Sequence, residues 1–190
     1  VLELGGKGPT LILPDADLDE ALPIALMSGF ANSGQACVAG TRILVPQALL
    51  PEIEARMKQE VAKFKVGDPK NADVRIGPMA SLAQWNRVQS YIRLGLEEGA
   101  TLLTGGVDRP EGLTKGWFVR PTIFTNVTND MRIAREEIFG PVISLISYRD
   151  EDEAVAIAND SDYGLQAYVL GRNMDNAQRV AAKLVVGRVV

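Results

Sequence analysis

The sequence lacks histidine entirely and has a single cysteine, Cys37, in 190 residues. A lone cysteine cannot form a disulfide within the chain or build a multi-cysteine metal site, and it fits a reducing compartment. Because no imidazole is available, a nucleophilic Cys37 would have to give its proton to a carboxylate, either directly or through water. Chemistry at this thiol therefore requires an acidic residue close by.

Basic charge and long apolar runs are also scarce. The 20 lysines and arginines are outnumbered by 24 acidic residues, which gives a net charge of -4. A nucleic-acid partner is disfavoured, because neutralising phosphates needs a basic surface. No apolar run approaches the roughly 18 residues that a membrane helix needs, and no secretory signal is visible. We expect a cytoplasmic protein with a small-molecule substrate and no membrane, nucleic-acid or metal partner.

Stretches with strand character alternate with stretches of helical periodicity. Strands are predicted at 10–13, 41–45, 101–104, 117–124, 142–148 and 166–170, and helices at 18–30, 51–64, 82–96, 151–158 and 174–184. This alternation predicts an α/β fold, with a mostly parallel sheet and helices on both faces. Such sheets place ligands at the carboxyl ends of their strands. Because the chain also opens and closes on strand-like residues, we expect a part of a longer protein.

Cys37 follows a polar, glycine-containing segment, Asn-Ser-Gly-Gln at 32–35. This composition suits an irregular loop better than a helix interior, and such a loop can expose a thiol among free backbone amides. Those amides could stabilise both a thiolate and a tetrahedral oxyanion. The alternative is that Cys37 is a small buried hydrophobe, the usual state of a lone cysteine.

Glu3 is the natural carboxylate partner for Cys37. It lies between Leu2 and Leu4, and glycines at 5 and 6 leave room for another group to approach the backbone. A carboxylate held among apolar residues is partly desolvated, which raises its pKa toward that of a useful general base. A cysteine with a glutamate suits attack on a carbonyl followed by hydrolysis of a thioester. The alternative is a solvated glutamate in an edge strand.

The segment Glu-Glu-Ile-Phe-Gly-Pro at 136–141 is a third candidate, because it leads into the strand predicted at 142. A carboxylate at a strand entrance can accept hydrogen bonds from sugar hydroxyls, with the Phe139 ring packing alongside. The alternative is a solvated loop with a packed phenylalanine. The glycines at 5, 6 and 8 lack the Walker spacing, and no Gly-x-Gly-x-x-Gly follows a strand, so neither phosphate-binding motif is predicted.

Taken in order, these segments resemble the aldehyde dehydrogenase superfamily over essentially the whole chain. The matching stretches are Leu-Glu-Leu-Gly-Gly-Lys-Gly-Pro at 2–9, Asp-Ala-Asp-Leu-Asp at 15–19, Phe-Ala-Asn-Ser-Gly-Gln-Ala-Cys at 30–37 and Glu-Glu-Ile-Phe-Gly-Pro-Val at 136–142. The resemblance implies that 1–190 is the family's catalytic domain, a Rossmann-like α/β sheet. It also implies that the N-terminal cofactor-binding domain is absent from this chain and that the parent protein is a homo-oligomer, a dimer or tetramer.

The resemblance implies a role for each matching residue. Cys37 is the nucleophile that forms a thiohemiacetal with the aldehyde and, after hydride leaves for NAD or NADP, a thioester; its backbone amide is one oxyanion donor. Glu3 activates the water that releases a carboxylic acid. Glu137 binds the nicotinamide ribose, Phe139 packs near the nicotinamide, and Leu4 offers its carbonyl to the carboxamide.

Three alternatives stay open. A CoA-acylating relative would release the thioester to CoA, although such relatives often lack the glutamate found here as Glu3. A thiol hydrolase would use Cys37 and Glu3 to cleave activated esters without a cofactor. A non-catalytic protein could keep the fold. Because most of the family's cofactor site lies in the N-terminal domain, we expect no dehydrogenase activity from residues 1–190 alone.

Overall fold

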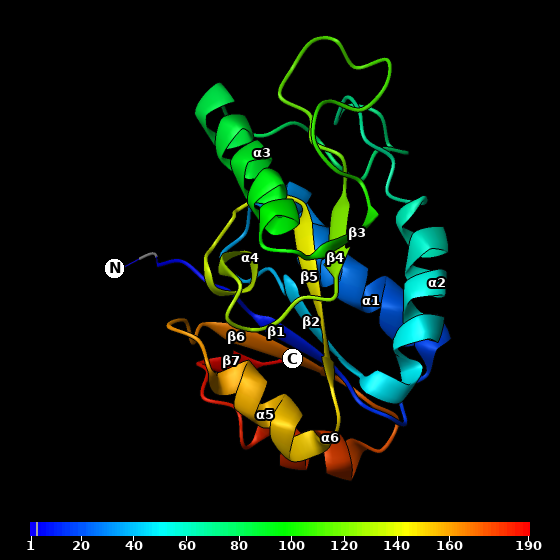
Figure 1. Cartoon of the computed structure of the whole chain (residues 1–190), viewed down its shortest axis with the longest axis vertical. Coiled ribbons are helices and arrows are strands. Elements are labelled where there is room, and N and C mark those ends of the chain that lie inside the picture. The colour runs from blue at the N-terminus through cyan, green and yellow to red at the C-terminus, as the bar shows by residue number, and fades with distance from the viewer. Residues whose placement is uncertain (3) are drawn as a thin grey trace.

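The centre of the fold is a seven-stranded sheet in the order β3-β4-β5-β2-β1-β6-β7 (Figure 1). The structure, a computed structural model, describes residues 1–2 and 4–190. The strands are β1 (Pro9–Ile12), β2 (Arg42–Pro46), β3 (Thr101–Thr104), β4 (Thr122–Thr125), β5 (Val142–Tyr148), β6 (Gln166–Leu170) and β7 (Arg188–Val189). Neighbouring strands run parallel, except that β3 pairs antiparallel with β4 at one edge. The predicted mostly parallel sheet is therefore confirmed.

Six α-helices connect the strands in the described part of the chain. They are α1 (Leu18–Phe30), α2 (Leu50–Val61), α3 (Leu82–Glu97), α4 (Arg132–Arg135), α5 (Glu151–Asn159) and α6 (Met174–Ala181). The side chains that precede four of them each accept a hydrogen bond from an amide of the first turn; these are Asp17, Ser81, Asp150 and Asn173. Such caps contribute about 1 kcal/mol each and fix where the helices begin.

The helices cover both faces of the sheet. Ile43 and Val45 of β2 pack in one core with α1 and α2, whereas Leu44 between them packs in another core with α5 and α6. This division follows from the two-residue period of a strand. In Figure 1, α1 lies behind the strands and α3 lies in front. The α/β class with helices on both faces is confirmed. Because the strands carry apolar side chains on both faces, the sheet lies between the two layers of helices.

Some predicted boundaries differ from the structure. Residues 1–2 and 4–8 lie outside strands, and pairing begins only at Pro9. The helix predicted to reach Phe64 ends at Val61, after which Phe64 donates to the Val61 carbonyl in a tight turn. The strand predicted from 117 begins at Thr122, directly after Pro121, which has no amide to donate. The four-residue helix α4 is too short to be recognised by periodicity.

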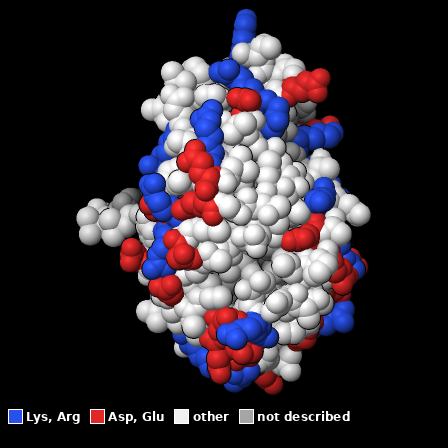
Figure 2. All heavy atoms as spheres, viewed as in Figure 1, with Lys and Arg blue, Asp and Glu red and all other residues white. Residues whose placement is uncertain are grey.

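Charged side chains of both signs occur on the surface. On the face shown in Figure 2, acidic and basic side chains are intermixed around a broad uncharged centre. Within the described chain, no helix combines the length and the apolar composition that crossing a bilayer demands.

Candidate active site

The segments predicted to carry chemistry meet at the amino ends of neighbouring strands. The Gly5-Gly6 pair precedes β1, Cys37 precedes β2 and Glu137 precedes β5. Because these strands are parallel and β2 lies between the other two, their lead-in segments converge on one edge of the sheet. The expectation that ligands lie at the carboxyl ends does not hold for this cluster.

A strained turn presents Cys37. After α1 the chain enters a short 3₁₀ segment, η1 (Ala31–Gly34), in which Asn32, Ser33 and Gly34 have φ values of 50°, 58° and 70°. Left-handed backbone costs a non-glycine residue roughly 1–2 kcal/mol, so neighbouring contacts must hold Asn32 and Ser33 in place. The predicted loop is confirmed in outline, because Cys37 lies in a turn and not in a helix.

Hydrogen bonds from outside the loop supply that restraint. The Ser33 hydroxyl accepts from the Gly77 amide at 2.9 Å, and the Gln35 side-chain oxygen accepts from the Ala80 amide at 2.8 Å. Both donors lie in the segment that leads into α3. The position of Cys37 is thus fixed by a part of the chain some forty residues away, which explains how a strained turn can be retained.

Gly34 brings the cysteine loop against the segment that enters β5. A methyl group at Gly34 would lie 2.1 Å from the Gly140 carbonyl oxygen, which is closer than any real contact. Only glycine allows this approach together with a φ of 70°. The contact places the loop that carries Cys37 beside the loop that carries Glu137 and Phe139.

Gly6 joins Cys37 to Glu137. A methyl group at Gly6 would lie 2.0 Å from the Cys37 carbonyl oxygen, so the two backbones are in direct contact. The Gly6 amide also donates to the Glu137 Oε1 atom at 2.8 Å. At Gly5, an added methyl group would lie 2.6 Å from Glu137 Oε2. The two glycines are therefore needed because the carboxylate and the cysteine loop both pack against this backbone.

Cys37 is a half-buried residue and a free cysteine. The turn that follows is fixed to β6, since the Tyr168 hydroxyl donates to the Val38 carbonyl at 3.0 Å. The residue is accordingly neither enclosed in the core nor left on a free loop.

Glu137 and Phe139 form the second half of the site. Glu137 Oε1 is held by the Gly6 amide, whereas Oε2 has no hydrogen-bond donor among the described residues. Phe139 has a φ of 59° and is 37% exposed, so its ring is presented at the surface. The free carboxylate oxygen of Glu137 can accept hydrogen bonds from sugar hydroxyls, and the exposed ring of Phe139 can pack on a flat heterocycle attached to that sugar. Glu137 does not lie in a wholly solvated loop, because its carboxylate accepts from the Gly6 amide.

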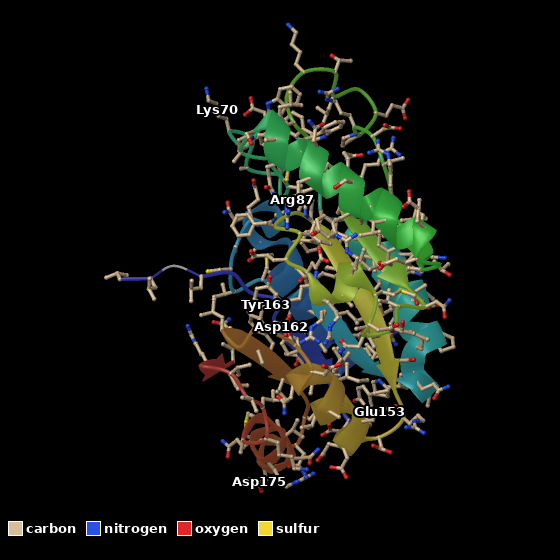
Figure 3. All side chains as sticks on the ribbon, turned by 60° about the vertical axis from the view of Figure 1, so that its left-hand side comes forward. Lys70, Arg87, Glu153, Asp162, Tyr163 and Asp175 are labelled. Atoms are coloured by element: carbon tan, nitrogen blue, oxygen red, sulfur yellow. The ribbon has the colours of Figure 1, made fainter. Side chains whose placement is uncertain are left out.

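Two residues of α3 hold this segment, and sequence reasoning missed both as site residues. Gln84 donates from its side-chain amide to the Phe139 carbonyl at 2.7 Å and to the Ile138 carbonyl at 3.0 Å. Arg87 donates to the Glu137 carbonyl at 2.6 Å, and Figure 3 shows it on the face of α3 that looks toward this segment. Their spacing of three residues puts them on one side of the helix, but only the fold reveals what that side faces.

Glu136 has a different environment from its neighbour. Its carboxylate pairs with Arg132 at 2.7 Å and accepts from the Tyr91 hydroxyl. These partners lower its pKa, with the Arg132 hydrogen bond as the largest cause. Glu136 therefore belongs to a surface network that anchors the loop, and Glu137 is the carboxylate directed toward the glycines.

Two further predicted site residues are Leu4 and Glu3. Leu4 is 70% exposed, and its predicted contact through the carbonyl stays a prediction. Glu3, the predicted general base, lies outside the described residues, so its role also stays a prediction. Across the described chain, no three histidine, cysteine or acidic side chains are grouped as metal ligands.

An apolar cleft of about 520 Å³ adjoins the cysteine loop. It lies between α1, the loop around Cys37 and β6. Its lining includes Ile24, Met27, Ala31, Ala36, Val38 and Tyr168 and contains no charged residue. Ala36 and Val38 flank Cys37 in sequence, whereas Cys37 itself is not one of the lining residues.

Comparison with known proteins indicates the family of this chain. The model of the aldehyde dehydrogenase family matches residues 1–190. Aldehyde dehydrogenase C of Pseudomonas syringae, solved as a cysteine-to-alanine mutant with NAD+ and octanal, is 49% identical, with a TM-score of 0.96 over 98% of this chain and 39% of that one. An aldehyde dehydrogenase of Mycobacterium tuberculosis solved with NAD+ is 45% identical, with a TM-score of 0.96 over 98% of this chain and 38% of that one.

Sequence relatives give the same family and show how much of it is present. A relative from Staphylococcus haemolyticus is 50% identical over 188 residues, which are 99% of this chain and 40% of that protein. The chain thus spans about 40% of the length of the curated relatives it matches. With a family match over its full length, the chain belongs to the aldehyde dehydrogenase family.

Proposed function

We propose that residues 1–190 are the catalytic domain of an NAD(P)+-dependent aldehyde dehydrogenase that oxidises an aldehyde to a carboxylic acid. The observation that carries the proposal is the double contact of Gly6, which packs on the Cys37 carbonyl and donates to Glu137. One backbone segment thereby joins the candidate nucleophile to the candidate cofactor carboxylate. The cofactor-binding domain and a homo-oligomeric assembly, a dimer or tetramer, belong to the same proposal.

Cys37 supplies the covalent step. Its thiolate adds to the aldehyde carbonyl, and the oxygen of the resulting thiohemiacetal takes up the negative charge beside the Cys37 amide. Bound NAD(P)+ supplies the hydride acceptor that converts this adduct to a thioester. The half-buried position of Cys37 supports the assignment, because the thiol is open to a small molecule and partly shielded from water.

Glu3 completes the reaction as the base for hydrolysis. It takes a proton from the water that attacks the thioester, which releases the carboxylic acid and regenerates the Cys37 thiol. Residues 1–190 contain no histidine that could take this proton.

Glu137, Phe139 and Leu4 would hold the nicotinamide end of the cofactor. The free Oε2 atom of Glu137 can accept from ribose hydroxyls, and the exposed Phe139 ring can pack near the nicotinamide. The Leu4 carbonyl would accept from the carboxamide. Gln84 and Arg87 contribute by fixing the backbone of this segment.

We assign the apolar cleft that adjoins the cysteine loop to the substituent of the aldehyde. Its lining is apolar and uncharged, which favours an aliphatic or aromatic substituent over an anionic or cationic one. The Pseudomonas syringae relative solved with octanal is in keeping with this preference.

The test of this function is the Glu3→Gln variant of the full-length enzyme. Loss of the base should slow steady-state acid formation by about 10²–10⁴-fold while one equivalent of NAD(P)H per Cys37 still forms in a pre-steady-state burst. Stopped-flow absorbance at the NAD(P)H band, combined with acid quantification, measures both. Glu20→Gln, an exposed position on α1, is the matched control and should behave as the unsubstituted enzyme.

Other outcomes select among the alternatives. Full steady-state turnover by Glu3→Gln would refute the assignment of Glu3. Rescue of turnover by CoA would favour an acylating enzyme, in which the thioester passes to a thiol acceptor. Ester cleavage without oxidation of any aldehyde would favour a cofactor-independent thiol esterase, and inactivity in both assays a non-catalytic protein.

A further inference from the structure

Arg42 is a buried cation at the start of β2, with an exposure of 1%. Its Nε atom donates to the Lys7 carbonyl at 3.1 Å, and its Nη1 atom donates to Asn129 Oδ1 at 2.9 Å. The Ile157 carbonyl accepts from Nη1 at 3.1 Å, and the Ala158 carbonyl accepts from Nη2 at 2.9 Å. Burying a charged group is costly unless hydrogen bonds compensate for the lost water, and these acceptors supply that compensation.

Two of these acceptors give Arg42 a structural role. Ile157 and Ala158 lie in the last turn of α5, where carbonyls lack a partner within the helix and carry the negative end of its dipole. Burial, followed by the charge of Arg135, lowers the pKa of Arg42 to about 10, so the guanidinium that caps the helix stays charged near neutral pH. The bonds to the Lys7 carbonyl and to Asn129 are not part of this cap and need another explanation.

The bond to the Lys7 carbonyl reaches the candidate site. Lys7 directly follows Gly6, whose amide donates to Glu137 Oε1 at 2.8 Å. This lead-in to β1 precedes the ladder that pairs β1 with β2, so other contacts must hold it. Arg42 supplies two of them, because its amide donates to the Gly8 carbonyl at 3.3 Å and its side chain donates to the Lys7 carbonyl. Arg42 thus fixes the backbone that carries the donor of the Gly6–Glu137 hydrogen bond.

The bond to Asn129 reaches the acceptor of the same hydrogen bond. The Asn129 side-chain amide donates to Asp160 Oδ2 at 2.8 Å. Arg135 holds both oxygens of the Asp160 carboxylate, at 2.9 Å and 3.0 Å. Arg135 is the last residue of α4 and lies shortly before Glu137 in the chain. Through Asn129 and Asp160, the Arg42 guanidinium is therefore linked to the segment that carries Glu137 into β5.

We propose that Arg42 is a positioning residue for Glu137. Its buried guanidinium fixes the lead-ins to β1 and β5 relative to each other, and so sets how the Glu137 carboxylate is presented to the hydroxyls of a nicotinamide ribose. The inference rests on the function proposed above and adds a residue to which that proposal gives no role. At 1% exposure Arg42 does not reach the cofactor; it acts through the two backbone segments that it joins.

Binding of NAD+ and of ADP to the full-length enzyme separates this role from a general loss of stability. ADP carries the adenosine and both phosphates of NAD+ but lacks the nicotinamide ribose, so in the proposed function it does not use Glu137. For Arg42→Met we expect the Kd for NAD+ measured by calorimetry to increase about tenfold, as for the loss of a hydrogen bond to a charged group, while the Kd for ADP stays within about twofold. The melting temperature should also fall, because α5 loses its cap.

Asn129→Ala tests the same link with the buried charge in place and covers the case in which Arg42→Met does not fold. Asn129 is half-buried, and the variant keeps the other hydrogen bonds of Arg42. Asn159→Ala is the matched control, because Asn159 is also half-buried, ends α5 and makes two side-chain hydrogen bonds, with the Lys183 carbonyl and the Val185 amide. Both variants should have lower melting temperatures, but only Asn129→Ala should weaken NAD+ binding, by about fivefold.

Three results would overturn the role of Arg42. The first is an unchanged Kd for NAD+ in folded Arg42→Met or Asn129→Ala. The second is a parallel loss of NAD+ and ADP affinity, which would indicate a general loosening of the fold. The third is an equal loss of NAD+ affinity in Asn159→Ala, which would assign the effect to the end of α5 as a whole. In each case the unsubstituted enzyme still binds NAD+, and the proposed function stands. If the unsubstituted enzyme binds neither ligand, the proposed function itself fails, and the role of Arg42 fails with it.

Discussion

At the scale of the residue, the state of Cys37 depends on its backbone as much as on its sulfur. Two non-glycine residues in left-handed conformation precede it, and hydrogen bonds from the lead-in to α3 hold them there. A cysteine that only filled space in a core would not need such a turn. The arrangement keeps the thiol half-exposed at a fixed position, which is what a nucleophile requires.

We expect Cys37 to react as an accessible thiol in the native protein. Iodoacetamide should modify the chain stoichiometrically near neutral pH, and mass spectrometry of the intact protein and its peptides would locate the adduct. Cys37→Ser should take up no label, since the chain has no other cysteine. Protection of Cys37 until denaturant is added would instead support a buried hydrophobic residue.

At the scale of the element, glycines allow the loops that precede three strands to pack closely against one another. Gly6 lies in the lead-in to β1 and contacts the lead-in to β2, while Gly34 contacts the lead-in to β5. In each case an added methyl group would overlap a backbone carbonyl oxygen, which cannot move aside as a flexible side chain can. The site therefore depends on the mutual approach of three strand entrances.

Gly6→Ala tests that dependence. The new methyl group would meet the Cys37 carbonyl oxygen at 2.0 Å, so the β1 and β2 entrances must separate. A displacement of about 1 Å can cost about 100-fold in rate, and we expect a loss of at least that size in the kcat/KM of the full-length enzyme. Gly77→Ala is the control, because its methyl group would find its nearest neighbour at 3.8 Å. Equal activities of the two variants would contradict the tight contact.

The elements themselves were largely predictable, because local signals determine them. Asp17, Ser81 and Asn173 mark helix starts, and strands such as β5 and β6 are rich in apolar and aromatic residues. The site was predictable only in part. Cys37 and Glu137 could be named from their motifs, whereas Gln84 and Arg87 could not, because the carbonyl groups that they hold lie fifty or more positions away in the chain. The amino-end location also depends on strand order, which no local pattern encodes.

At the scale of the whole molecule, the proposed function gives the chain one end of a cofactor site. In that proposal Glu137 and Phe139 meet the nicotinamide and its ribose, while Gln84 and Arg87 hold the backbone of their segment. The sequence contains no glycine fingerprint for a pyrophosphate. The chain also spans about 40% of the length of its curated relatives, and the two solved relatives described above hold NAD+ as longer chains. Full cofactor affinity should therefore need residues beyond these 190.

We accordingly expect residues 1–190 alone to bind NAD+ and NADP+ only weakly. The pyrophosphate and adenosine contacts that a helix amino terminus and a ribose carboxylate normally supply make up much of a dinucleotide's binding energy. Loss of about 4 kcal/mol of such contacts weakens binding about a thousandfold and would turn a micromolar site into a millimolar one. Dehydrogenase activity should then be absent, with slow ester cleavage through Cys37 the most that is retained. Calorimetric titration of the chain with each cofactor measures this directly. The full-length enzyme serves as the positive control, and a micromolar dissociation constant for the 190 residues would mean that most of the cofactor site lies within them.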